Sequence, residues 1–123
     1  MHLDPEAFEA LVAQAVDQLP EWVRAHIDNV AITLQQAPSP EQRRAGRVRD
    51  GFELLGLYEG VPLTQRGRGY QMVPPDRITL FQRALERSAP DATALVALIR
   101  HTIIHEIAHH FGFSEERLRE LDC

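Results

Sequence analysis

Apolar side chains recur at intervals of three and four near the start of the chain, a spacing typical of one face of a helix. The positions that share this spacing are Phe8, Leu11, Val12, Ala15 and Leu19. Asp4 and Pro5 match the N-cap and the first helical position, and Pro20 follows the last apolar residue. The pattern predicts a helix over residues 5–19.

Val30, Ile32 and Leu34 alternate with Ala31, Thr33 and Gln35, which predicts a strand over 28–35. Further strands are predicted over 52–58 and 77–82. A polar segment, 38–51, separates the first two and is predicted to be a loop. Short helical turns are predicted around 22–23 and over 83–88.

A long apolar stretch near the end of the chain predicts a helix over 89–111. Ser88 and Asp91 have the spacing of a capping box, and Pro90 falls where a first-turn proline is tolerated. Gly112 is the residue expected in the left-handed conformation just after a helix. Because the first half of this segment is apolar nearly all round, we expect the helix to be buried in a core.

The order helix, strands, helix predicts an α+β fold, with a mixed sheet that is covered on one side. The 123 residues, 44% hydrophobic and 25% charged, have the composition of an ordinary globular domain. We therefore expect one domain over residues 1–123, with room for one core and a shallow substrate groove.

The net charge of −5 and the pI near 5.6 argue against a nucleic-acid-binding surface along the whole chain. The arginine cluster at 43–49 is interpreted as a solvated loop or helix face. The single cysteine, Cys123, excludes an intramolecular disulfide, and no segment is long and apolar enough for a membrane span or a signal peptide. These features predict a cytoplasmic protein with no membrane partner.

Candidate chemistry lies in the long helix, in the sequence His105-Glu106-Ile107-Ala108-His109. On a helix, His109 falls about 40° and Glu106 about 100° from His105, so the three polar side chains share one sector. Two imidazoles at this spacing can hold one Zn²⁺, and the adjacent carboxylate can act as a general base toward water. The pattern indicates a zinc hydrolase.

A catalytic zinc site has three protein ligands, so a third donor is needed. The spacing from His105 through Gly112 to Glu115 matches the pattern H-E-x-x-H-x-x-G-x-x-H, with Glu in place of the last His. Glu115 is therefore the predicted third ligand, and Glu116 is the alternative. Both glutamates are also compatible with a solvated first helical turn that Ser114 caps.

An ordinary helix with solvent-facing His and Glu side chains is the competing interpretation, because HExxH also arises by chance. Burying these side chains without a ligand or a wet cleft would cost several kcal/mol. Four of the six histidines lie within ten residues of one another: His101, His105, His109 and His110. This clustering favours a metal site.

Residues 105–118, together with 75–81, resemble the small bacterial zincin-like metallopeptidases, sometimes called minimal metalloproteases. The resemblance implies a compact zincin-type fold and metal-dependent hydrolysis of peptides or proteins. It departs from metzincins in the acidic residue at 115 and in the lack of a methionine after the motif. In a zincin an extended substrate adds to a free strand edge near the metal, and the candidates are 77–82 first and 52–58 second.

Two other functions remain open. Bacterial ribosomal-RNA maturation endonucleases use H-x3-H-x5-H, a spacing that His105, His109 and Glu115 share, and a zinc-binding interaction module without turnover is the non-enzymatic alternative. Glu106 favours peptide hydrolysis over both.

Tyr58, Tyr70 and His101 are possible supplementary hydrogen-bond donors in the site, and His110 is expected to be an outer residue rather than a ligand.

Overall fold

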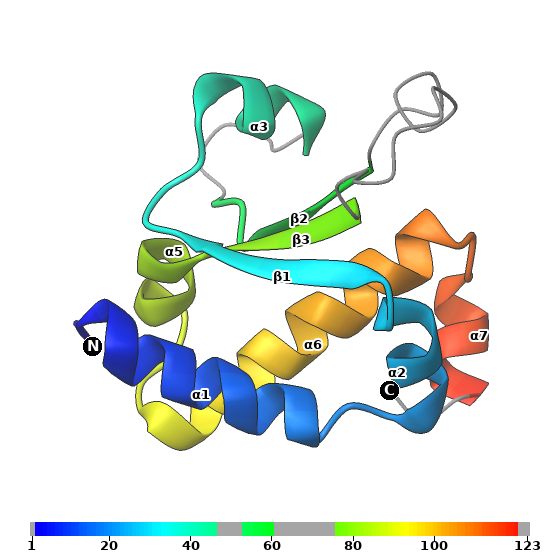
Figure 1. Cartoon of the computed structure of the whole chain (residues 1–123), viewed down its shortest axis with the longest axis horizontal. Coiled ribbons are helices and arrows are strands. Elements are labelled where there is room, and N and C mark those ends of the chain that lie inside the picture. Colours follow the sequence, from blue (N-terminus) through cyan, green and yellow to red (C-terminus); the bar gives the residue numbers. More distant parts are fainter. Residues whose placement is uncertain (1, 47–52, 61–75, 121–123) are drawn as a thin grey trace.

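The computed structural model describes residues 2–46, 53–60 and 76–120 (Figure 1). The elements follow one another as α1 (Pro5–Asp17), α2 (Glu21–Ile27), β1 (Val30–Gln35), α3 (Pro40–Ala45), β2 (Gly56–Glu59), β3 (Asp76–Phe81), α5 (Gln82–Arg87), α6 (Ala92–His110) and α7 (Glu115–Glu120). The fold class is α+β, as predicted.

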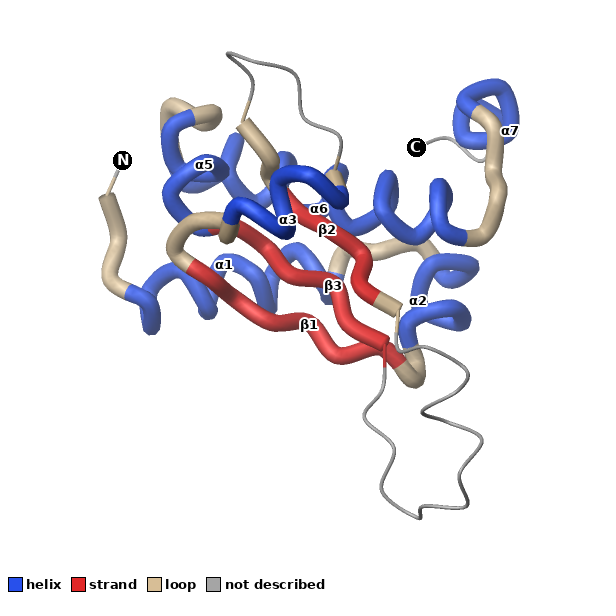
Figure 2. The backbone as a smooth tube through the Cα atoms, turned by 90° about the horizontal axis from the view of Figure 1, so that it is seen from above, coloured by secondary structure: helices blue, strands red, loops and turns tan. Residues whose placement is uncertain are grey.

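The described strands form a mixed sheet in the order β1-β3-β2 (Figure 2). β1 runs parallel to β3 and β2 runs antiparallel to it. Since β3 has a neighbour on both sides, its hydrogen-bonding groups are used within the sheet. The prediction that 77–82 offers a free edge is therefore wrong, and the second candidate, now β2, lies at an edge.

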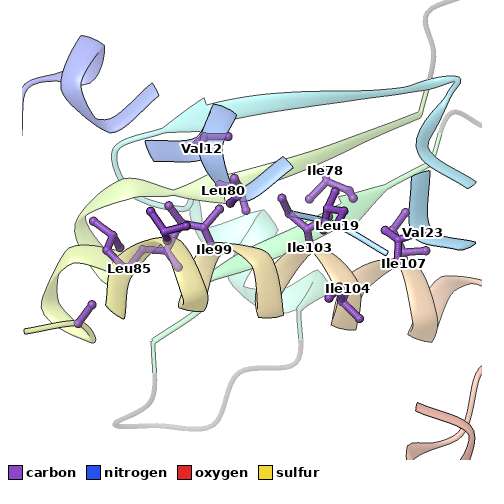
Figure 3. Close-up of a cluster of buried hydrophobic side chains, with 14 of the residues drawn as sticks. Val12, Leu19, Val23, Ile78, Leu80, Leu85, Ile99, Ile103, Ile104 and Ile107 are labelled. Atoms are coloured by element: carbon purple, nitrogen blue, oxygen red, sulfur yellow. The ribbon is translucent and has the colours of Figure 1, made fainter. Parts of the chain in front are cut away.

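The core lies between the inner face of the sheet and the helices α1 and α6 (Figures 1 and 3). Its largest fully buried aliphatic side chains come mainly from α6 and β3: Ile78, Leu80, Leu85, Leu95, Ile99, Ile103, Ile104 and Ile107. α6 is thus a buried helix, as its sequence predicted. Within the described part of the chain, no helix has the length and hydropathy needed to cross a membrane.

The outer face of the sheet carries polar side chains near α3, which lies on the side opposite α1 and α6 (Figure 1). Thr79 donates its hydroxyl hydrogen bond to Glu59 at 2.8 Å, and Gln42 of α3 donates to the same carboxylate at 3.2 Å. The predicted loop 38–51 is therefore partly wrong, because residues 40–45 form α3. Its start is a capping box between Ser39 and Gln42 that the loop assignment overlooked. Arg43 and Arg44 of the arginine cluster 43–49 lie in the last turn of α3, and residues 47–49 lie outside the described residues.

The limits of β2 and β3 differ from the prediction, because the pattern of apolar and polar side chains does not define where these strands begin and end. β2 begins at Gly56, whereas the predicted strand began at 52, which lies outside the described residues. β3 is shifted by one residue, because Gln82 starts α5. The predicted helices at 5–19 and around 22–23 correspond to α1 and α2, and the predicted strand 28–35 corresponds to β1.

The start of α6 also differs from the prediction. Asp91 is the N-cap and accepts a hydrogen bond from the Ala94 N–H at 2.8 Å. Ser88 instead ends α5, and its hydroxyl donates to the Ala84 carbonyl at 2.9 Å. The predicted capping box at Ser88 is therefore wrong, because a separate short helix uses that serine.

The end of α6 matches the prediction for Gly112, which has φ of +79°. The Phe113 N–H donates to the Ala108 carbonyl at 2.7 Å, and the Gly112 N–H donates to the His109 carbonyl at 3.2 Å. This pair of bonds is the Schellman motif, and it reverses the chain directly after His110.

A buried carboxylate holds the N-terminal residues against α5. Glu86, whose side chain is 2% exposed, accepts hydrogen bonds from the Leu3 N–H at 2.9 Å, from Gln82 at 3.0 Å and from Arg83 at 2.8 Å. Burial raises the pKa of Glu86, but these three donors lower it, and the resulting pKa lies below the ordinary value.

We expect Glu86→Gln to lower the free energy of unfolding at pH 7 by about 1–3 kcal/mol, because the amide leaves buried donors without a charged acceptor. Since the folded-state pKa is depressed, the stabilisation by the carboxylate is complete above the unfolded pKa of about 4.3 and is lost as the pH falls through the folded pKa. Urea denaturation across this pH range measures the effect. Glu9→Gln, at an exposed site of α1, is the matched control. Equal unfolding free energies for the two variants at pH 7 would contradict the prediction.

Candidate metal centre

One face of α6 carries His101, His105 and His109, which follow one another at intervals of four residues. The ring centroids of His101 and His105 are 4.6 Å apart, and those of His105 and His109 are 4.9 Å apart. His105 is half-buried, whereas His101 and His109 are exposed. The helix thus brings together the two histidines predicted as ligands and adds His101 beside them.

The spacing of His105 and His109 fits a shared zinc ion. With Zn–N distances of about 2.0–2.1 Å and tetrahedral angles, two ligating imidazoles place their ring centroids on the order of 5 Å apart. The observed 4.9 Å agrees with this value. The separation of the two rings is thus compatible with one shared ion.

Glu106 is held toward the sheet by β2. Its Oε1 accepts a hydrogen bond from the backbone N–H of Tyr58 at 2.9 Å. Burial raises the pKa of Glu106, whereas the Tyr58 N–H and the nearby charge of His109 lower it, and the resulting pKa lies above the ordinary value. The carboxylate is therefore partly desolvated and has a defined orientation next to the two histidines.

The hydrogen-bond pattern of β2 explains why this N–H is available to α6. Leu55 accepts a hydrogen bond from the Phe81 N–H at 3.0 Å, which makes these two residues a bonded antiparallel pair. By alternation, the main-chain polar groups of Gly56 and Tyr58 point away from β3, toward the edge. Glu106 thus contacts the edge of the sheet that lies over α6.

Gly56 allows β2 to approach α6 closely. A Cβ atom built at this position would lie 2.7 Å from Cγ2 of Thr102 and 3.3 Å from the carbonyl oxygen of Thr79. Any larger residue would push the strand away from the helix. The hydrogen bond between Tyr58 and Glu106, two residues further along the strand, depends on this approach.

A cleft of about 230 Å³ opens between β2 and α6 beside the candidate site. One wall consists of Leu54, Leu55 and Gly56. The other consists of four side chains of α6: His101, Thr102, His105 and Glu106. The cleft is small and open, in line with the shallow groove expected from the chain length.

The predicted third ligand lies just after the reversed turn. α7 begins at Glu115, and Ser114 caps it by accepting a hydrogen bond from the Arg117 N–H at 3.0 Å. The side chain of Glu115 is outside the described part of the structure, and that of Glu116 is exposed. Among the described residues, no group of three His, Cys, Asp or Glu side chains is placed to hold a metal ion. The choice between Glu115 and Glu116 stays a prediction.

The other residues considered from the sequence have separate environments. The hydroxyl of Tyr58 donates to Asp76 at 2.6 Å, and its ring stacks on His110 with centroids 3.8 Å apart. The described contacts thus direct the Tyr58 hydroxyl away from Glu106 and place His110 outside the row of three histidines. Tyr70 lies outside the described residues.

Sequence reasoning missed the backbone N–H of Tyr58 and the apolar wall of the cleft. A backbone donor leaves no mark on residue type, so no sequence signal could have identified it. Gly56 did offer a signal, because a glycine inside a strand often marks the close approach of another backbone or helix.

Residues 27–123 match the family model described as zincin-like metallopeptidase. The chain belongs to this zincin-like family. The matched region includes the sheet, α6 and the turn into α7. No curated protein matches the chain.

A solved structure has the same fold. It is a conserved hypothetical protein from Thermo thermophilus, with a TM-score of 0.57 and 23% sequence identity. The match covers 89% of this chain and 94% of that chain. Membership in the zincin-like family implies a metal cofactor and a peptidase role.

Proposed function

We propose that this zincin-like protein is a zinc-dependent peptide-bond hydrolase. The observation that carries the proposal is the position of the Glu106 carboxylate, which the Tyr58 N–H holds at 2.9 Å beside two histidines whose rings are 4.9 Å apart. A structural metal site needs no such oriented base.

In this proposal His105, His109 and Glu115 hold the ion. Two imidazoles and one carboxylate form a donor set that suits zinc. The Schellman turn at Gly112 supports Glu115 as the third ligand, because it folds the chain back immediately after His110. When bound, zinc supplies Lewis acidity to the scissile carbonyl and to the attacking water.

Glu106 acts as the general base in this mechanism. The Tyr58 N–H engages Oε1, and we assign Oε2 to the proton of the attacking water. The same carboxyl group then delivers that proton to the nitrogen of the leaving amine, which restores the carboxylate. The hydrogen bond to β2 restricts rotation of the Glu106 side chain before the reaction. Less side-chain entropy is therefore lost when Glu106 acts as the base.

The substrate is proposed to bind along the edge of β2. Gly56 presents its main-chain N–H and carbonyl there, two residues from the N–H that holds Glu106. An extended peptide that adds to this edge by backbone hydrogen bonds lies between the strand and the histidine row of α6. This arrangement favours a peptide over RNA as the substrate.

Substitution of both His105 and His109 by alanine is expected to abolish zinc binding, because the remaining carboxylate is too weak a site by itself. Elemental analysis and competition with a colorimetric chelator measure the zinc content. A metal that binds only the folded state at a hundredfold excess over Kd stabilises it by about 2.7 kcal/mol, so chelation should also lower the Tm of the wild type but not of the variant. A variant that retains a full equivalent of zinc would exclude these ligands.

Glu106→Gln is expected to retain zinc and the fold but to lose at least about a hundredfold in turnover, because an amide cannot accept the proton of water. Its amide oxygen can still accept the Tyr58 N–H, so the variant isolates proton transfer from orientation. The assay uses peptides found by screening the zinc-loaded wild type against a peptide library and an RNA panel. Unchanged peptide cleavage by the variant would rule out Glu106 as the base. Cleavage of RNA but not peptides would favour the nuclease function, and no cleavage of either would favour the interaction module.

Glu115→Ala is expected to weaken zinc binding by at least about tenfold, whereas Glu116→Ala, its matched control one residue away, should have little effect. Zinc dissociation constants measured by chelator competition test this difference. A larger loss in Glu116→Ala would move the third ligand to that residue, and unchanged affinity in both variants would leave a two-histidine site.

A further inference from the structure

We propose that Trp22 of α2 is a positioning residue for zinc binding, because it holds the turn that leads from α6 to Glu115. This inference rests on the proposed function, in which His105, His109 and Glu115 bind the ion. It adds a residue from outside the region that matches the family, since that region begins at residue 27.

Two aromatic rings of α2 contact the turn at Gly112. α2 lies beside the C-terminal end of α6 (Figures 1 and 2). The ring of Trp22 stacks on that of Phe113, with centroids 4.9 Å apart and planes 12° apart. The ring of His26 lies against Phe111, with centroids 4.6 Å apart. The residues on either side of the glycine are thus both held by α2.

α2 also orients its own two rings. The Nδ1–H of His26 donates a hydrogen bond to the Trp22 carbonyl at 2.7 Å, within one turn of the helix. The two rings meet edge to face, with centroids 6.3 Å apart. They therefore form a fixed aromatic surface against which the turn packs.

Phe113 is the residue through which this contact acts on the turn. Its N–H donates to the Ala108 carbonyl at 2.7 Å, which is the longer bond of the Schellman motif. Glu115, the first residue of α7, follows two positions later. A Phe113 ring held against α2 therefore fixes the direction in which the chain leaves α6 and enters α7.

The turn has little packing elsewhere. Phe111 is 44% exposed, and a Cβ atom built on Gly112 would meet no atom of the described residues within 4 Å. A ligand on a loosely held segment must be ordered when the metal binds, and this ordering weakens binding. By ordering the turn in advance, the stack on Trp22 strengthens the binding of zinc.

The stacking surface of Trp22, rather than its polar atom, carries this role. Its indole N–H is buried, and no described residue accepts a hydrogen bond from it. Because an unpartnered buried donor is unfavourable, the indole nitrogen does not account for the position of the ring. Trp22→Phe keeps a ring and loses no described hydrogen bond, whereas Trp22→Leu removes the ring.

The first experiment measures zinc dissociation constants of full-length variants by chelator competition. Trp22→Leu should weaken zinc binding by at least about tenfold, the lower end of the effect of residues that support ligands, and Trp22→Phe should restore it to within about threefold of the wild type. Leu11→Ala is the matched control, because it removes a half-buried side chain next to Val96 and Ala97, in the N-terminal half of α6. Wild-type affinity in Trp22→Leu, or an equal loss in Leu11→Ala, would overturn the proposal.

A double-mutant cycle tests whether Trp22 acts through the third ligand. In the Glu115→Ala background, Trp22→Leu should cause no further loss of affinity, because the turn then carries no ligand to be positioned. Additive losses would show that Trp22 affects the site by another route and would overturn the proposal.

The last experiment uses the fluorescence of Trp22, which is the single tryptophan of the chain. Zinc added to the metal-free wild type should change the emission with the dissociation constant found by chelator competition. Glu116→Ala should retain this change, and Glu115→Ala should lose it. Unchanged emission in a wild type that binds zinc and cleaves peptides would overturn the positioning role and retain the hydrolase. The expected change in a protein that cleaves no peptide would retain the positioning role and overturn the hydrolase.

Discussion

The burial of α6 against the sheet and α1 is the constraint on which the rest of the structure depends. Ile99, Ile103 and Ile107 are each fully buried in this interface, and burying one such side chain stabilises the fold by about 1.5–3 kcal/mol. These contacts fix the rotation of the helix about its axis. With the apolar face directed into the core, His101, His105 and His109 must lie together on another face, and Glu106 must lie toward β2.

The contact between β2 and α6 orients Glu106, the proposed base, beside the histidines. Gly56 permits the strand to approach Thr102, and the Tyr58 N–H then reaches Glu106 at 2.9 Å. The same close approach creates the cleft that His101 and Thr102 line. The orientation of the proposed base and the cleft therefore have one structural origin. A displacement of β2 would alter both together.

The short turn at Gly112 shapes the proposed site at the C-terminal end of α6. Its left-handed conformation closes α6 and starts α7 only a few residues later. The turn thus brings Glu115, the proposed third ligand, to within a few residues of the end of α6. The match to the zincin-like family over residues 27–123 spans these elements, whereas α1 and all of α2 except Ile27 lie outside it.

Local sequence was sufficient to predict α1, α6, the left-handed Gly112 and the grouping of His105, Glu106 and His109, because helical periodicity and capping act over a few residues. It also indicated three strands and the α+β class. It could not decide which strand lies at the edge, because the central place of 77–82 depends on pairing with β1 and β2 at the same time. Nor could it show that the main chain of Tyr58 holds Glu106, since this contact joins residues 48 positions apart. Such decisions belong to the tertiary structure, because they depend on distances between segments that only the packing of the core brings together.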